Sequence, residues 1–199
     1  HIFFPDRPDF NPNLTPREIF IDGSFGGTYW KPIHSRAQGK DLRNQHLEFD
    51  DWWRGIPDDL LISEKYEKSR NKYLVSCGTP LSMWESKGWI REQDPYGWVQ
   101  WYCRFFAGRR SDDDERQIRR WRAFAGKRGR FRLQLINKII ANEALHDDFS
   151  VSPVIRQSLQ HWGYRLTVSD FEKESLKKWK EDLSWEKTKL SEMKDEIGK

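Results

Sequence analysis

Arginine and lysine side chains are concentrated between Arg109 and Arg130, and such side chains are suited to binding phosphate. A guanidinium group donates two parallel hydrogen bonds to a phosphate, and a cluster of such groups gives salt-sensitive affinity for nucleic acid. The alternative is a solvated surface whose arginines pair with nearby acids. The residues that we expect to contact phosphates are Arg109, Arg110, Arg116, Arg119, Arg120, Lys127, Arg128 and Arg130.

A block of acids, Asp112 to Glu115, stands at the start of the arginine-rich segment. Carboxylates can hold Mg²⁺ for phosphoryl chemistry. However, acids in the first turn of a helix also stabilise its dipole, and consecutive residues point in different directions around a helix. We therefore favour helix capping, and we expect no metal ion and no other cofactor.

A glycine-rich segment, GSFGGTYWKPI at residues 23–33, is a second candidate for ligand contact. Its backbone amides could approach a phosphate or a base, with Tyr29 or Trp30 stacking on the base and Lys31 beside them. The segment lacks the spacing of a nucleotide-binding loop. The alternative is a tight turn that buries its aromatic rings.

The histidines and cysteines form no recognisable catalytic or metal-binding set. The five histidines have no metal-ligand spacing, and two cysteines cannot complete a zinc site alone. Cys103 lies in an apolar run, where we expect it to be buried. His161 stands near the end of an expected helix, where we favour interaction with the helix dipole over contact with a phosphate or base.

Helices must position these side chains, and the sequence contains signals for their ends. A capping residue followed by proline is typical of a helix start, and glycine is typical of a helix end. The expected starts are Thr15-Pro16, Thr79-Pro80, Asp94-Pro95 and Ser152-Pro153, and the expected ends are Gly88, Gly108 and Gly163.

The run from Asp94 to Gly108 is apolar nearly all round, which predicts a buried central helix. Ser111 and Asp114 then form a capping-box pattern before a second helix, which carries the arginines and an apolar face. The glycines of residues 19–33 predict a loop or a short hairpin, and residues 72–77 could form a short strand. The predicted fold class is mainly α.

Composition predicts a compact domain with an aromatic core over residues 1–167. Hydrophobic residues make up only 36% of the 199 residues, but 15% are aromatic, including 11 Trp. Each large ring buries about 150–250 Å², so a few rings can replace many aliphatic side chains. No apolar run is long enough for a membrane span, and the two cysteines fit a reducing compartment, the cytoplasm or nucleus. Since the chain begins with His1, we expect an excerpt of a longer protein or a cleaved form.

Residues 168–199 differ from the rest and predict one long amphipathic helix. Apolar residues recur there at alternating steps of three and four: Leu176, Trp179, Leu183, Leu190, Met193 and Ile197. That spacing is typical of a coiled-coil arm, and also of a helix that packs back on its own domain. Self-association or a protein partner is therefore expected at residues 169–199.

Three segments together resemble an uncharacterised protein family of fungi, algae and large DNA viruses. They are GSFGGTYWKPI at residues 23–33, DPYGWVQWYCRFFAGRRSDDDERQIRRW at residues 94–121, and RQSLQHWGY at residues 156–164. The resemblance implies a shared domain over most of residues 15–165 and implies no particular activity. The C-terminal helix lies outside it.

These observations lead to three functional hypotheses. The first is a nucleic-acid-binding module, with DNA favoured over RNA, which uses the arginine-rich helix and its flanking loops. The second is an enzyme acting on nucleic acid, a base-flipping glycosylase or a nuclease, with an aromatic pocket and a carboxylate. The third is a protein-interaction scaffold that uses the C-terminal helix.

Overall fold

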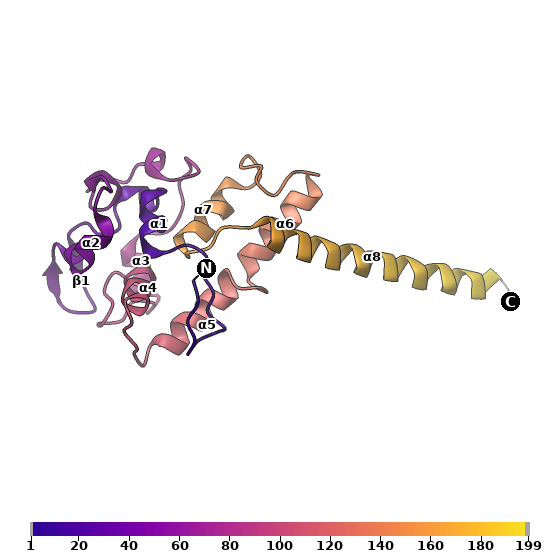
Figure 1. The fold of residues 1–199 in the computed structure, drawn as a ribbon, viewed down its shortest axis with the longest axis horizontal. Coiled ribbons are helices and arrows are strands. Elements are labelled where there is room, and N and C mark those ends of the chain that lie inside the picture. Colours follow the sequence, from indigo (N-terminus) through magenta and orange to yellow (C-terminus); the bar gives the residue numbers. More distant parts are fainter. Residues whose placement is uncertain (1, 198–199) are drawn as a thin grey trace.

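The computed structural model describes residues 2–197, without the side chains of residues 182 and 185–197. Helices dominate this part of the chain, which confirms the predicted mainly α fold (Figure 1). Short 3₁₀ turns connect the longer elements. The helices are α1 (Pro16–Ile21), α2 (Asp50–Trp53), α3 (Leu81–Ser86), α4 (Trp98–Phe106), α5 (Asp114–Phe124), α6 (Arg130–Ala141), α7 (Pro153–His161) and α8 (Val168–Ile197), and the strands are β1 (Ile33–Ser35) and β2 (Lys40–Leu42).

The predicted central helix is α4, and its side chains are buried on nearly every side. Phe10, from the N-terminal segment, packs its ring against the rings of Trp101 and Trp121 at centroid distances of 5.5 and 5.2 Å. Farther along the same core, the rings of Phe20 and Trp53 meet edge to face at 5.1 Å. One continuous aromatic core therefore joins the N-terminal segment to α1, α2, α4 and α5.

Glycine ends three helices where the sequence predicts an end. Gly88, Gly108 and Gly163 all have positive φ, a conformation that glycine adopts without steric cost. After Gly88, the amide of Trp89 donates to the carbonyl of Trp84, five residues back. This six-to-one bond is the Schellman ending, which satisfies carbonyls at the end of a helix.

Two predicted helix starts are wrong in position. Asp94-Pro95 does not begin α4, which starts at Trp98 after Gly97, because the Asp94 side chain is fully buried and paired with arginines. Thr79 does not cap α3, which starts at Leu81. Its hydroxyl instead accepts a hydrogen bond of 2.7 Å from the Trp84 indole. In both cases another side chain occupies the group that would have capped the helix, arginines 10 and 15 residues away for Asp94 and a tryptophan of the same helix for Thr79.

The β structure also differs from the expected one. Residues 72–77 form turns and irregular backbone, so the predicted strand there is wrong. The antiparallel pair β1–β2 lies just after the glycine-rich segment, with Ile33 opposite Leu42. Residues 23–32 themselves form a loop with one short 3₁₀ turn.

The N-terminal segment and the end of α7 are joined directly. The Asn13 side chain donates to the Arg165 carbonyl at 2.7 Å and accepts from the Arg165 amide at 2.8 Å. The amide of Leu14 also donates to the Gly163 carbonyl at 3.0 Å. These bonds close the domain across 152 residues of sequence.

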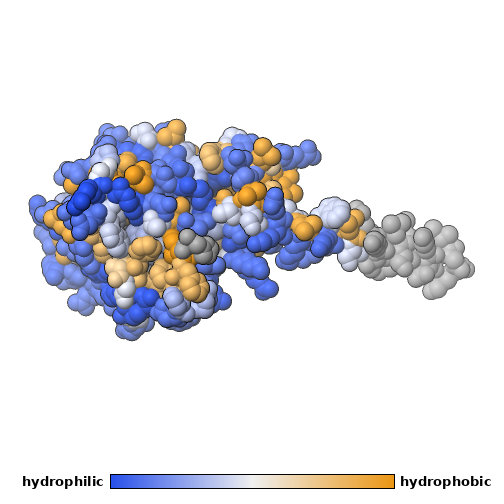
Figure 2. All heavy atoms as spheres, viewed as in Figure 1, coloured by the Kyte–Doolittle hydropathy of each residue, from blue (hydrophilic) through white to orange (hydrophobic). Residues whose placement is uncertain are grey.

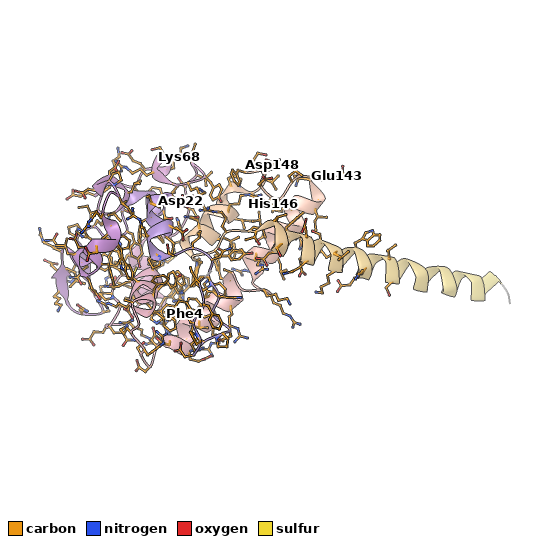
Figure 3. The ribbon with its side chains drawn as sticks, in the orientation of Figure 1. Phe4, Asp22, Lys68, Glu143, His146 and Asp148 are labelled. Atoms are coloured by element: carbon orange, nitrogen blue, oxygen red, sulfur yellow. The ribbon has the colours of Figure 1, made fainter. Side chains whose placement is uncertain are left out.

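The connection between α6 and α7 is held by a buried arginine. The Arg156 guanidinium donates to the carbonyls of His146 and Asp148, each at 2.9 Å, and Figure 3 labels these two residues beside α7. Burial lowers the pKa of Arg156, because the charged form loses contact with water. Its role is to satisfy loop carbonyls.

The long C-terminal helix is confirmed over Val168–Ile197. Its first turns pack on α6, where Arg132 pairs with Asp170 at 2.8 Å. Figure 1 shows the rest of α8 extending away from the other helices. Leu176 and Trp179 are exposed there, while the side chains of Leu190, Met193 and Ile197 lie outside the described residues.

Candidate functional site

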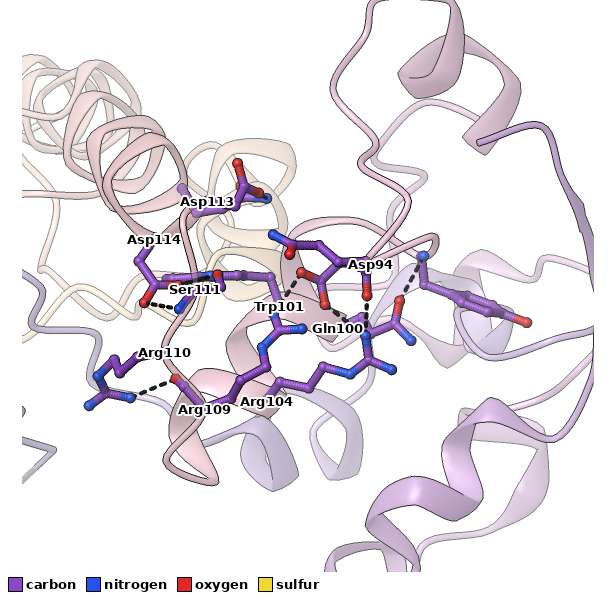
Figure 4. A network of polar contacts seen from close by, with 12 residues as sticks. Asp94, Gln100, Trp101, Arg104, Arg109, Arg110, Ser111, Asp113 and Asp114 are labelled. Carbon is purple, nitrogen blue, oxygen red and sulfur yellow. Dashed lines mark hydrogen bonds and ion pairs between the residues drawn. The ribbon is translucent and has the colours of Figure 1, made fainter. Parts of the chain in front are cut away.

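Arg109, the first of the expected phosphate ligands, is bound to a buried carboxylate. Its guanidinium donates to Asp94 at 2.6 Å, and Arg104 donates to the other oxygen of the same carboxylate at 3.0 Å (Figure 4). The Asp94 side chain is only 1% exposed. A carboxylate at this depth requires such partners, since an unpaired buried charge is strongly destabilising. Arg109 is therefore part of the fold.

Arg110 and Arg116 are also paired with acids. Arg110 makes two hydrogen bonds to Asp6, at 2.6 and 3.1 Å, which raise the pKa of the guanidinium. Arg116 makes two hydrogen bonds to Asp113, at 2.5 and 2.7 Å. Bidentate pairs of this kind use the same donors that would bind a phosphate. These two arginines therefore match the alternative of a charged surface with internal partners.

The acidic block at the start of α5 forms only part of the predicted capping box. Asp114 accepts hydrogen bonds from the Trp101 indole at 2.8 Å and from the Ser111 amide at 2.9 Å. The capping residue is Asp113, whose side chain caps no amide. One half of the predicted capping box is present, the bond from the Ser111 amide to the Asp114 carboxylate, but the Ser111 hydroxyl donates to Asp114 instead of capping its amide. Within the described residues, no group of His, Cys, Asp or Glu could hold a metal ion.

The remaining cations are free of carboxylates and lie close together in the sequence. Arg119, Lys127 and Arg128 are exposed and make no ion pair within the described part of the chain. Arg130 is exposed too, and its guanidinium lies 4.9 Å from the ring centre of Phe131. We name this set, Arg119, Lys127, Arg128 and Arg130, the basic edge. It spans the outer side of α5, the following turn and the start of α6.

The glycine-rich segment is a tight turn that buries its rings. A Cβ atom on Gly27 would lie 2.0 Å from the carbonyl oxygen of Asp59, so only glycine fits there. Trp30 is fully buried, and a base cannot reach its ring. The Tyr29 hydroxyl donates to the Tyr96 carbonyl at 2.7 Å and accepts from the Gln100 amide at 2.9 Å. Lys31 extends toward the carbonyl of Glu64, at 3.5 Å.

Beside the basic edge lies a cleft that contains three of the predicted site residues, Tyr29, Arg120 and Arg130, and whose position the sequence did not predict. It has a volume of about 780 Å³, within the range typical of small-molecule sites. We name it the aromatic cleft. Its lining comes from α3, α4, α5, α6 and α7, from loops next to them and from the glycine-rich segment. Its aromatic members are Phe25, Tyr29, Trp84, Trp89, Trp98, Phe124, Phe131, His161 and Trp162.

Several rings of the aromatic cleft stack on each other while keeping part of their surface open. Phe124 lies between Phe131 and Trp162, at centroid distances of 4.0 and 4.8 Å and interplanar angles of 13° and 19°. All three side chains are half-buried. On the face shown in Figure 2, most of the surface is hydrophilic and the apolar side chains gather in separate clusters. An open set of stacked rings is a surface suited to a flat apolar ligand.

Arg120 places its guanidinium in the aromatic cleft, where the groups that contact it among the described residues are neutral. Its guanidinium carbon lies 5.6 Å from the ring centre of Trp89 and 5.4 Å from that of Trp162. Its hydrogen bond is to the neutral Gln117 amide at 2.9 Å, and no carboxylate pairs with it in the described chain. Burial, and then the charge of Arg116, lower its pKa to about 10, so Arg120 remains charged at neutral pH.

His161 lines the same cleft as a neutral hydrogen-bond donor. Its Nε2 accepts from the Phe25 amide at 3.0 Å, so this nitrogen carries no proton. Burial lowers the pKa of the imidazole to about 3, which keeps it neutral at physiological pH. The remaining proton must then lie on Nδ1. The expected interaction of a charged His161 with the helix dipole is therefore wrong, because the ring is buried and uncharged.

The amide of Gln157 reinforces this proton arrangement. Its Oε1 accepts from the Tyr73 amide at 3.1 Å, and its Nε2 donates to the Gly23 carbonyl at 3.1 Å. The same Nε2 lies 3.1 Å from His161 Nε2, where it acts as a second donor. The orientation of Gln157 and the tautomer of His161 are thus consistent with each other.

No acid contributes to the wall of the aromatic cleft as far as the structure describes it. Its polar members are Cys77, Thr79, Arg120, Arg130, Ser158 and His161. The Cys77 thiol lies 3.0 Å from the Ser158 hydroxyl, and burial raises the pKa of that thiol. A glycosylase or nuclease that uses a carboxylate in its pocket would need an acid here. The cleft therefore offers hydrogen-bond donors and aromatic rings.

Comparison of the chain with protein-family models, with curated proteins and with solved structures found no match. The resemblance to a family of fungi, algae and large DNA viruses therefore stays a prediction. No helix among the described residues, α8 included, is long and apolar enough to cross a membrane.

Proposed function

We propose that this protein is a nucleic-acid-binding module, with DNA as the favoured partner, and that the basic edge contacts the phosphates. The observation that supports this proposal is the division of the cations into two groups. Arg109, Arg110 and Arg116 are engaged with acids, whereas the four cations of the basic edge pair with no acid among the described residues. Unpaired arginines and lysines on one edge give a positive potential that attracts a polyanion.

The proposal is tested by titrating the full chain with duplex and single-stranded DNA at several salt concentrations. We expect the logarithm of the affinity to fall linearly with the logarithm of the salt concentration, by about 0.7–0.9 per phosphate contacted. The double variant Lys127→Glu/Arg128→Glu should bind weakly and with a smaller salt slope. Affinity that does not depend on salt, or no binding at low salt, would overturn the proposal.

The matched control changes the same charges elsewhere. Lys40 and Arg43 are exposed, lie in and next to β2, and make no ion pair within the described residues. The double variant Lys40→Glu/Arg43→Glu lowers the net charge as much as Lys127→Glu/Arg128→Glu does. Retained binding in this control and lost binding in the basic-edge variant would assign the contact to the basic edge instead of to total charge.

A second candidate function is protein interaction through α8, which includes self-association. Leu176 and Trp179 stand one turn apart on the helix and are 52% and 59% exposed. Two exposed apolar side chains at this spacing are typical of a coiled-coil face that lacks its partner. We place both functions inside the cell, in the nucleus or cytoplasm, a proposal supported by the free thiols of Cys77 and Cys103.

A further inference from the structure

We propose that the aromatic cleft receives one unstacked nucleobase whose edge carries hydrogen-bond acceptors, of the guanine type, from a strand held at the basic edge. This inference rests on the proposed function and names the part of the nucleic acid that the protein reads. It is carried by four features of the cleft: its ring surfaces, its donors, its backbone geometry and its position beside the basic edge.

The ring surfaces suit a flat aromatic guest. Trp162 and Phe131 leave part of their surface open to the cleft, and Trp89 is 42% exposed. Bases stack on aromatic side chains with little dependence on sequence, because every base has a π face. A volume of about 780 Å³ is large enough for a nucleotide and does not need an opening movement.

The donors specify the edge of the guest. The Arg120 guanidinium carries several N–H groups and uses one on Gln117 at 2.9 Å. Arginine pairs with the O6 and N7 acceptors of guanine in two parallel hydrogen bonds. Adenine presents an amino group beside its N7, and that donor would face another donor. The cleft therefore favours the base that offers two adjacent acceptors.

His161 adds a donor of fixed orientation. Its side chain is nine-tenths buried, and its Nδ1–H has no acceptor within the described residues. A Cβ atom on Gly78, another lining residue, would lie 4.0 Å from this Nδ1. The Nδ1–H group is thus at the cleft wall where Gly78 leaves space. An acceptor on the guest would satisfy it.

The backbone at this wall is held in an uncommon conformation. Phe25 has a φ of 55°, a left-handed value that is unfavourable for a bulky side chain. Its amide is held by His161, and its ring stacks on the imidazole at 4.0 Å. Strain of this kind persists where surrounding contacts enforce it and is concentrated at ligand sites.

The cleft and the basic edge share a boundary. Arg130 belongs to both, and Ala123, on the cleft wall, is one helical turn from Arg119 on α5 and four residues before Lys127, which lies in the turn after the helix. A strand whose phosphates contact the basic edge would therefore place a base at the mouth of the cleft. Phosphate contacts would position the strand, and the cleft would select the base.

The test uses the full chain and short single strands of deoxyadenosine that carry one central substitution. We expect the strand with a central deoxyguanosine to bind about tenfold more tightly than the strand with a central abasic site. The all-adenine strand should fall between them. Tryptophan fluorescence should change on binding of the guanine strand, because Trp89 and Trp162 line the cleft. Equal affinities for all three strands would overturn the inference.

Variants locate the base in the cleft. Ala123→Trp fills the mouth from an exposed helix position and should remove the preference for guanine, whereas Ala141→Trp, exposed at the end of α6, should keep it. Trp89→Ala supplies a second test that does not crowd the fold, with the exposed Trp179→Ala as its control. A preference for guanine that survives both Ala123→Trp and Trp89→Ala would contradict binding of the base in the aromatic cleft.

The two proposals fail in different ways. If no strand binds with salt-sensitive affinity, the proposed function itself is wrong. If all strands bind equally, and Lys127→Glu/Arg128→Glu still weakens them, the basic edge contacts phosphates and the cleft reads no base. Arg120→Gln separates donor recognition from stacking, since it should lower the affinity for the guanine strand to that for the all-adenine strand while the abasic strand binds as before.

Discussion

Asp94 precedes α4 in the sequence and Arg109 follows it. The Arg109 guanidinium lies 2.6 Å from the buried Asp94 carboxylate. The pair joins the segment before the central helix to the segment after it. Arg104, from within α4, completes the arrangement by donating to the same carboxylate at 3.0 Å. An arginine that resembles a phosphate ligand in the sequence is thus part of the structural frame of the core.

We predict that Asp94→Asn destabilises the protein by about 3–5 kcal/mol. The substitution keeps the size of the side chain but removes the charge, and it leaves Arg104 and Arg109 without their shared partner. Chemical denaturation of the wild type and the variant, monitored by tryptophan fluorescence, measures the difference. The control is Asp51→Asn, whose exposed pair with Arg54 should contribute within about 0.5 kcal/mol. Similar effects of both substitutions would refute the role of the buried pair.

We predict that His161 makes the protein less stable in acid. Burial lowers the pKa of the folded state to about 3, below the ordinary value of 6.5, so the unfolded chain binds the proton more tightly. The stability is fully present above pH 6.5 and is lost as the pH falls from there toward 3, by roughly 1 kcal/mol per unit. Unfolding free energies at pH 7 and pH 5 measure this loss.

The matched variants for this pH dependence are His161→Gln and His34→Gln. A glutamine oxygen at position 161 can still accept the Phe25 amide, but it takes up no proton. We expect His161→Gln to lose less stability between pH 7 and pH 5 than the wild type does. The His34 side chain is 64% exposed, so its variant leaves the core unchanged and is the control for the loss of an imidazole. An unchanged pH dependence in His161→Gln would show that the imidazole is not buried and neutral.

We predict that Gly27→Ala is far more damaging than Gly39→Ala. Both glycines have positive φ, 81° and 64°, so both substitutions strain the backbone by about 1 kcal/mol. Only at Gly27 would the new methyl group collide with a backbone oxygen, that of Asp59 at 2.0 Å. We expect a total loss of about 3 kcal/mol there, measured by denaturation. Equal losses would mean that the turn can open to accept a side chain.

We predict that the full chain self-associates through α8 and that Trp179→Glu weakens this association. The indole is 59% exposed, so the variant should fold as the wild type does while placing a charge on the apolar face. Sedimentation over a range of protein concentrations measures the effect, and removal of residues 169–199 should leave a monomer. The neighbouring Lys180→Glu is the control. If the wild-type chain stays monomeric at every concentration, another protein is the partner to search for.

Local signals predicted the parts of the fold that depend on local chemistry. Gly88, Gly108 and Gly163 end their helices because a left-handed residue is needed there whatever the surroundings are. The burial of Cys103 and its neighbours in α4 follows from their apolar run. Asp94 and Thr79 were misassigned because partners distant in sequence or on the next turn compete for the side chain that would cap a helix.

The candidate site could be predicted only in part, for a related reason. Charge density located the basic edge, but ion pairs with Asp6 and Asp113 decide which arginines are free, and Asp6 is 104 residues away from its partner. The aromatic cleft left no sequence pattern, since its rings come from separate segments. The sequence does not distinguish tryptophans that build the core from tryptophans that line a cleft. Only the fold separates Trp30 from Trp89.

The hydrogen bonds between Asn13 and Arg165 join segments that are synthesised far apart in time. The N-terminal segment is translated first, but its partners at the end of α7 emerge from the ribosome only after nearly the whole domain has been made. Until then, Phe10 lacks Trp121, and the aromatic residues of the nascent chain have no complete core to enter. Closure over such a separation is slow, so the growing chain would depend on protection from aggregation until residue 165 is free.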